Sequence, residues 1–238
     1  MTQRSWRQVP SSVLAAVGVA LLLQIGWRAQ QPRPLATALA LPAAPAATVL
    51  KLVGLGDPLP VAHFAALYLQ AFDNQPGVSI PYWDLDYFRV EAWLERILDL
   101  DPAGQYPLLM ASQLYAQVPD PGKQRRMLEF VYRRFFEDPG RRWRWLAHAA
   151  IVAKHRLGDP SLALKYAQAI AAHSRNRNIP SWASQMPIFI LEDMGEAESA
   201  QILLGGLLAS GTLTDPMEIR FLTERLAQMQ EKNVKKSP

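Results

Sequence analysis

The short break at Gly158-Asp159-Pro160 is the feature that most limits the folds open to this chain, because it separates two helical patterns. Apolar residues recur at helical spacing on one face before the break and on one face after it: Leu146, Ala149, Ala150, Ala153 and Leu157, then Leu162, Ala163, Tyr166, Ala167 and Ile170. So short a connection makes the two helices antiparallel. Residues 145–170 are therefore predicted to form a helical hairpin, whose alanines allow close approach.

Similar patterns on both sides of this hairpin predict an all-α domain over residues 57–230. Breaker residues divide it into further helices, at about 61–72, 84–101, 107–117, 122–138, 181–194, 197–210 and 215–230, with a kink or a new start at Pro187. One hairpin cannot cover its own apolar face, whereas stacked neighbours bury it at about 25 cal/mol per Å². We therefore expect an α-solenoid of about four hairpins, closed by a capping helix.

Regular spacing supports this repeat. Glycines predicted to form turns lie at 122, 158 and 195, and helix-ending Asp-Pro pairs lie at 101–102 and 138–139. Ala163 and Ala200 each follow their glycine by five residues, and Pro139 follows Gly122 by seventeen. In the 34-residue tetratricopeptide repeat (TPR), a turn glycine is likewise followed by an alanine five residues later and a proline seventeen residues later.

The segment 57–230 thus resembles a degenerate TPR array, although its repeats are two or three residues longer than the family's 34-residue repeat. Pro102 and Pro139 also have no counterparts after the third and fourth hairpins. The resemblance implies a concave groove that binds a peptide or a partner helix.

An apolar stretch near the N-terminus predicts membrane attachment. Residues 1–10 form a basic tail, and residues 11–27 are almost free of polar side chains. As a helix they span about 25 Å, and Trp6 and Trp27 could lie at the two interfaces. We expect an uncleaved single-pass anchor, with a cleaved signal peptide and a soluble helix as the alternatives. The favoured location is a bacterial inner membrane with the repeat domain in the periplasm.

Residues 28–48, within a linker that spans 28–56, are rich in alanine and proline and predict an extended tether, with a proline-rich docking motif as the alternative. In this linker, the run Val53-Gly54-Leu55-Gly56 has two glycines but neither a third glycine nor a following Gly-Lys, so it is assigned to the linker and not to a phosphate-binding loop. Residues 231–238 are predicted to be a basic disordered tail.

Several classes of chemistry find no support. The chain contains no cysteine, which excludes disulfides, thiolate metal sites and cysteine nucleophiles. His148 and His155 share a helix face without a carboxylate at metal-site spacing, so we predict structural histidines and no metal ligands. Without a glycine-rich phosphate loop, a nucleophile elbow or paired carboxylates, we predict no catalytic residue, no cofactor, no small-molecule substrate and no enzyme activity.

Basic and aromatic residues alternate over residues 122–146, after an acidic helix. One interpretation is a charged contact for a partner protein, an anionic lipid or another polyanion, through Arg125, Arg126, Arg133, Arg134, Arg141, Arg142 and Arg144. Nucleic acid is the less favoured polyanion for a domain outside the cytoplasm. The other interpretation pairs the arginines with the acidic helix (Asp84, Asp86, Glu91, Glu95, Asp99 and Asp101) and places the aromatics between repeats.

These features together predict a membrane-tethered scaffold or assembly factor that binds partner proteins or peptides through its helical-repeat surface. The alternative function is anionic-lipid or polyanion binding through the arginine-rich second hairpin.

Overall fold

A computed structural model describes residues 10–31, 37–174 and 178–236, with side chains of the last helix described through Glu231. It divides into two compact units, Met1–Ala38 with Pro76–Val78, and Leu39–Gln75 with Ser79–Pro238. We call the second unit the helical domain. The predicted basic tail at 1–10 lies outside the described residues except for Pro10.

The first unit contains α1, which runs from Ser11 to Gln30 and is three residues longer than the apolar stretch 11–27. It is 20 residues long, none of them buried, and about 30 Å long at 1.5 Å per residue. Among the described residues it is the one helix long and apolar enough to cross a membrane. A signal sequence meets the same criteria of length and composition.

The helical domain confirms the all-α prediction. Its helices are α2 (Ala47–Val53), α3 (Leu59–Gln70), α4 (Tyr87–Leu100), α5 (Tyr106–Leu109), α6 (Pro121–Phe135), α7 (Pro139–His155), α8 (Pro160–Ala172), α9 (Ser181–Asp193), α10 (Ala197–Ala209) and α11 (Pro216–Lys236). A π-helical turn, Met110–Leu114, and a 3₁₀ turn, Tyr115–Gln117, extend α5. Further 3₁₀ turns cover Ala71–Asp73 and Tyr82–Asp84, and the two-residue strands are β1 (Asn74–Gln75) and β2 (Val78–Ser79).

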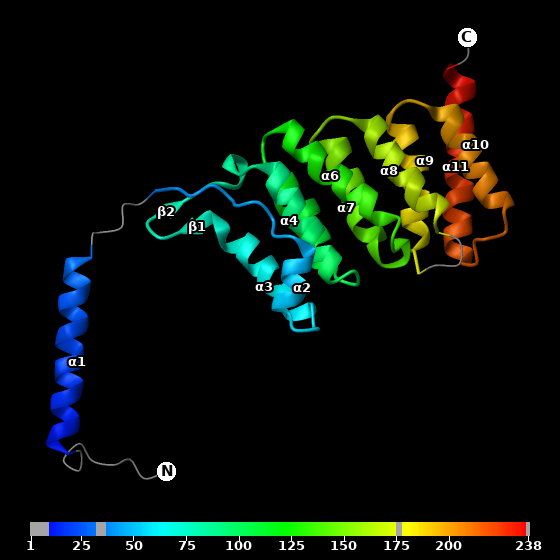
Figure 1. The fold of residues 1–238 in the computed structure, drawn as a ribbon. Helices are drawn as coiled ribbons and strands as arrows, with labels where there is room; N and C mark the ends of the chain where they lie inside the picture. Colours follow the sequence, from blue (N-terminus) through cyan, green and yellow to red (C-terminus); the bar gives the residue numbers. More distant parts are fainter. Residues whose placement is uncertain (1–9, 32–36, 175–177, 237–238) are drawn as a thin grey trace. The chain divides into compact units, whose positions relative to one another are not determined.

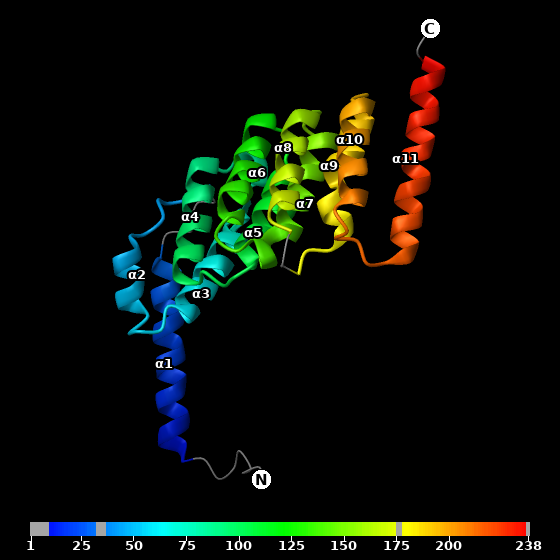
Figure 2. The same cartoon turned by 90° about the vertical axis from the view of Figure 1, so that its right-hand side faces the viewer.

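Helices that follow one another in the chain pack against one another (Figures 1 and 2). Contacts join α3 to α4 and then each helix from α6 to α11 to the next, and α4 also contacts α6. One large core extends from Leu41 to Ile190, and a smaller one joins α9, α10 and α11 around Leu204 and Leu222. The predicted hairpin at 145–170 is formed by α7 and α8, and α9 runs through Pro187 as one helix.

Several aspartate-proline pairs begin helices in this domain, whereas the pair at 101–102 follows the end of α4, as predicted. Pro121, Pro139 and Pro160 each lie at the first position of a helix, where the missing N–H costs nothing. The carboxylates of Asp120 and Asp159 accept backbone hydrogen bonds from Lys123 (3.0 Å) and Leu162 (2.8 Å). The pair at 138–139 follows the end of α6, as predicted, and also begins α7.

Two of the three predicted turn glycines lie in turns. Gly158 and Gly195 follow α7 and α9 with φ of +62° and +81°, the left-handed region in which glycine carries no steric penalty. Gly122 instead lies in the first turn of α6. The intervals from Gly122 to Gly158 and to Pro139 therefore join unlike positions, and only the 37-residue interval between Gly158 and Gly195 relates equivalent ones.

The predicted linker at 28–56, with its extended tether at 28–48, is wrong from Leu41 onward, because this part packs on the domain. Leu41 is 2% exposed, and its carbonyl oxygen accepts a hydrogen bond from Arg89. The indole Nε1 of Trp93 donates to the carbonyl oxygen of Pro42 at 2.9 Å, and α2 follows. At the other end, α11 continues to Lys236, which corrects the predicted disordered tail 231–238 over the described part.

Candidate interaction surfaces

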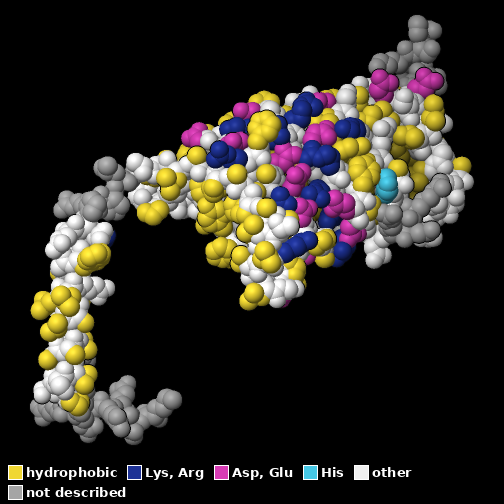
Figure 3. Space-filling view, viewed as in Figure 1, with side chains coloured by type: hydrophobic (Ala, Val, Ile, Leu, Met, Phe, Trp, Pro, Cys, Tyr) yellow, Lys and Arg dark blue, Asp and Glu magenta, His cyan; other side chains and the backbone are white. Residues whose placement is uncertain are grey.

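The arginines of α6 face the acidic residues of α4. Glu91 pairs with both Arg126 (2.6 Å) and Arg133, and Arg133 also reaches Glu95 at 3.4 Å. Arg134 pairs with Asp99 at 3.3 Å. For Arg126, Arg133 and Arg134, the structure therefore agrees with the interpretation that the acidic helix pairs with the arginines. Figure 3 shows the resulting mixture of acidic and basic side chains across the middle of this face.

The electrostatic environment of these arginines agrees with the pairing. Burial by itself lowers the pKa of Arg133, but hydrogen bonds and charge from Glu91 and Glu95 outweigh it and leave the pKa raised. The same balance raises the pKa of Arg134, where Glu137 and Asp99 supply the opposing charge. The protonated guanidinium groups are thus bound to the protein's own carboxylates.

The remaining arginines of the predicted contact occupy different environments. Arg125 pairs with Asp159 at 2.6 Å, and Arg141 pairs with Asp138. Arg142 is 1% exposed and cannot reach an external partner without unfolding. Arg144 is exposed, with its guanidinium 5.9 Å from the centre of the Trp143 ring. Of the seven predicted contact residues, Arg144 is thus the one for which the described residues provide no ion pair.

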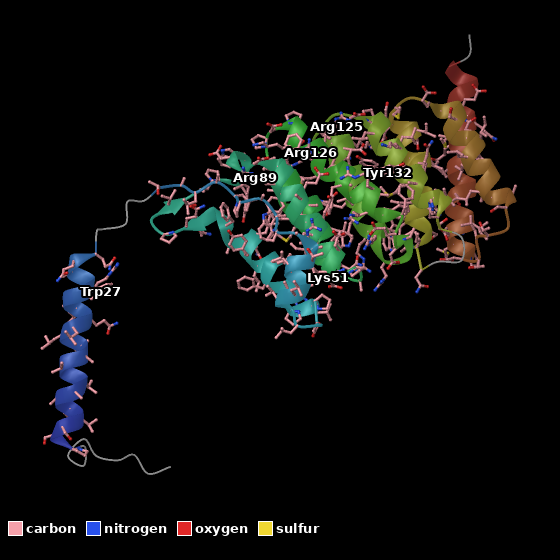
Figure 4. All side chains as sticks on the ribbon, in the orientation of Figure 1. Trp27, Lys51, Arg89, Arg125, Arg126 and Tyr132 are labelled. Carbon is pink, nitrogen blue, oxygen red and sulfur yellow. The ribbon has the colours of Figure 1, made fainter. Side chains whose placement is uncertain are left out.

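Aromatic residues of the same segment pack between helices. Tyr132 stacks on Tyr166 of α8 with ring centres 5.2 Å apart, and Phe135 is completely buried. Figure 4 labels Tyr132 beside Arg125 and Arg126 on α6. Lys165 covers the Tyr132 ring at 4.3 Å and pairs with Glu129 at 3.1 Å. These rings are occupied by the protein itself and form no free stacking platform.

The histidines show no metal-site geometry. Within the described residues, no group of three or more His, Asp and Glu side chains lies close enough to hold an ion. His148 is half-buried, and burial lowers its pKa more than its hydrogen bond to the backbone of Ser112 raises it. Its neutral form is therefore the one that the domain accommodates.

A pocket that the sequence analysis missed lies between α3 and the segment that follows α4. Its volume is about 480 Å³, within the usual range for ligand sites. The lining residues are Ala62, His63, Ala66, Leu67, Ile97, Asp101, Gly104, Gln105, Tyr106 and Pro107. The sequence of α3 held a signal for this pocket. The helix has no Asp, Glu, Lys or Arg, and apolar side chains lie on its exposed faces as well as on the face that packs on the domain.

The surface beside this pocket is apolar. We call it the α2–α3 surface; its exposed members are Val49, Leu52, Val53, Leu55, Leu59, Phe64 and Leu67. Figure 3 shows hydrophobic side chains gathered over α3. Residues 39–72 contain two charged side chains, Lys51 and Asp57, which contrasts with the ion-paired face of α4 and α6. Apolar patches of this kind mark contacts with proteins or membranes.

Comparison with protein-family models, with curated proteins and with solved structures gives no match.

Proposed function

We propose that this protein is a membrane-tethered scaffold or assembly factor, and that the pocket beside α3 binds an apolar side chain of a partner protein. The observation that carries the proposal is the open 480 Å³ pocket itself. In this proposal α1 is an uncleaved single-pass anchor in a bacterial inner membrane, and the helical domain lies on the periplasmic side.

The pocket combines apolar walls with a polar rim. Ala62, Ala66 and Ile97 present apolar groups, and the small alanines leave the space that a partner's side chain would fill. Such a site suits a leucine or an aromatic side chain, which are frequent anchors of protein interfaces.

Hydrogen bonds hold the rim in position. The Tyr106 hydroxyl donates to Oε1 of Gln70 at 2.6 Å, and Oε1 of Gln105 accepts from the Trp145 indole at 2.8 Å. A site arranged before binding loses less conformational entropy when the partner arrives, which favours affinity.

A TPR-like repeat is part of the proposal, and two hairpins support it. Gly158 and Gly195 have the same left-handed backbone at the start of equivalent turns. Ala163 and Ala200, each five residues later, are both fully buried. Repeats of this kind commonly use their outer surfaces to bind peptides and helices.

The alternative function, polyanion binding by the arginine-rich hairpin, has less support. Arg126, Arg133 and Arg134 already bind Glu91, Glu95 and Asp99, so an external anion would have to displace those carboxylates.

Site-specific photocrosslinking of the full-length protein in its own membranes tests the proposal. A photoreactive amino acid at His63, on the pocket wall, should capture a defined partner, whereas the same group at exposed Gln168 on α8 should not. Leu67→Asp, at an exposed position on the pocket edge, should abolish the adduct. Leu203→Asp, at an exposed apolar position on α10, should leave the adduct unchanged. An adduct that survives Leu67→Asp, or none beyond that at Gln168, contradicts the proposal.

A further inference from the structure

The end of α2 exposes apolar side chains for which the fold provides no partner among the described residues. Leu52, Val53 and Leu55 are 75%, 66% and 94% exposed, and Val49 is 51% exposed. Leu50, by contrast, packs against the core and fixes α2 to the domain. The helix therefore has one face for the domain and another turned away from it, and we call Val49, Leu52, Val53 and Leu55 the α2 tip.

Leu55 is the most unusual member of this tip. Its φ of +47° lies in the left-handed region, where it is the only described residue other than glycine. A branched side chain is disfavoured there, and glycine or asparagine would satisfy the turn at lower cost. Folding alone gives no reason for a leucine that is both strained and almost fully exposed. Its apolar side chain points to a contact outside the domain.

The turn that carries Leu55 is well defined. The amide of Gly54 donates to the carbonyl oxygen of Leu50 at 3.0 Å, and that of Asp57 donates to the carbonyl oxygen of Gly54 at 2.9 Å. A Cβ at position 54 would lie 2.5 Å from the carbonyl oxygen of Asp57, so glycine is required there. The amide of Leu59 donates to the Asp57 carboxylate at 3.0 Å and closes the turn. The tip is thus presented on a fixed backbone.

Few charges surround the tip, which suits a lipid surface. Residues 39–72 contain two charged side chains, Lys51 and Asp57. The Asp57 carboxylate accepts the hydrogen bond from Leu59 that closes the turn, whereas Lys51 is exposed beside the tip (Figure 4). A lysine can place its aliphatic stem in the interface while its ammonium group reaches lipid phosphates and water.

The length of the chain also favours a lipid surface over other occupants. Gln30 ends α1, and Leu41 is held by Arg89 on α4, so the connection covers eleven residue steps. Such a connection reaches at most about 40 Å. If α1 crosses the bilayer, the tip is kept at high effective concentration beside the headgroups, and even a weak affinity is then sufficient for docking.

We propose that the α2 tip inserts its apolar side chains into the interfacial layer of the same bilayer that α1 crosses. The tip then acts as a second membrane contact that sets the orientation of the helical domain on the membrane. This inference rests on the proposed anchor, since without α1 in the bilayer the tip has only its own small apolar area.

The absence of cysteine from the chain makes the test direct. Three single-cysteine variants of the full-length protein, Leu55→Cys, Gln168→Cys and Leu22→Cys, are labelled with the fluorophore NBD and reconstituted into phosphatidylcholine–phosphatidylglycerol vesicles. Quenching by doxyl-labelled lipids reports contact with the bilayer, and quenching by iodide reports contact with water. The label at 22 reports on the anchor, and the label at 168 on an exposed part of α8.

We expect doxyl lipids to quench the labels at 22 and 55 and to spare the label at 168. Iodide quenching at 55 should be weaker than at 168 by about threefold, the shielding expected for a side chain in the interface. Adding Leu52→Asp to Leu55→Cys should return the label at 55 to the behaviour of the label at 168, without changing the label at 22.

Other outcomes overturn the inference in distinguishable ways. Lipid contact at 22 with free access of iodide to 55 leaves the anchor intact and contradicts docking of the tip. Loss of lipid contact at both 22 and 55 contradicts the anchor as well. A label at 55 that neither reagent quenches, together with a doubled mass by light scattering in detergent, means that a second copy covers the tip.

Discussion

Nη2 of Arg142 donates a hydrogen bond to the carbonyl oxygen of Pro102 at 2.7 Å, across forty residues of sequence. The other terminal nitrogen, Nη1, donates to the carbonyl oxygen of Arg134 at 2.5 Å and to the Glu137 carboxylate at 2.6 Å. One buried guanidinium thereby joins the start of α7 to the end of α6 and to the loop after α4. An arginine predicted to contact a partner is instead an internal connector.

Removing this connector should destabilise the domain. Arg142→Leu leaves two carbonyl oxygens and one oxygen of the Glu137 carboxylate without their donor, and we expect a loss of about 3 kcal/mol in the free energy of unfolding. Urea unfolding of the full-length protein in detergent, followed by circular dichroism, measures this. The matched change at exposed Arg144, Arg144→Leu, should cost under about 0.5 kcal/mol. Equal losses in the two variants would mean that Arg142 is not the connector described here.

The pairing of α4 with α6 predicts energetic coupling between Glu91 and Arg126. Their side chains are 12% and 31% exposed, so solvent screens the pair only in part. A double-mutant cycle with Glu91→Gln and Arg126→Gln should give a coupling of about 1 kcal/mol. The more exposed pair of Arg141 and Asp138 should give less, about 0.3 kcal/mol. A coupling near zero for Glu91 and Arg126 would leave Arg126 available to an external anion.

Glu137 should make the stability of the protein depend on pH in the acidic range. Burial raises its pKa, but hydrogen bonds from Arg134 and Arg142 outweigh this and lower the pKa from its ordinary value of 4.5. The stabilisation is therefore complete above about pH 4.5 and is lost as the pH falls through the lowered folded-state pKa. Between pH 6 and pH 3 the Tm of Glu137→Gln should fall less than that of the parent protein. A parallel fall in the two proteins would show that Glu137 contributes nothing to the pH dependence.

Two glycine-to-alanine substitutions should have opposite effects. Gly195→Ala places a Cβ at φ +81° and should destabilise the protein by about 1 to 2 kcal/mol. Gly206→Ala lies in α10 with open space around the new Cβ and should stabilise the protein by about 0.5 to 1 kcal/mol. Thermal unfolding followed by circular dichroism compares them. A gain in stability for Gly195→Ala would mean that the turn after α9 does not use the left-handed conformation.

The helices and several turns could be predicted because their signals are local. The apolar spacing that predicts α7 and α8 lies within single helices, and the need for glycine at 158 arises from backbone sterics at one residue. The same local pattern was wrong at Gly122 and incomplete at Pro139, because aspartate and proline mark the start of a helix as readily as the end of the one before.

The candidate sites could be predicted only in part. An acidic helix before a basic one is compatible with ion pairs between the two helices and with arginines that bind a partner. The sequence alone left this choice open. The pocket beside α3 was missed, because Ala66 and Tyr106 come together only after α3 and α4 have packed.

Local sequence was sufficient to predict a helical chain, the glycine turns at 158 and 195, and an apolar segment before the domain. These properties depend on backbone sterics and on side chains within about four positions of one another. The burial of Arg142 and Leu41 could be seen only in the folded domain. The same holds for the pairing of Glu91 with both Arg126 and Arg133. Burial and ion pairing depend on which distant atoms meet, and packing between helices brings those atoms together.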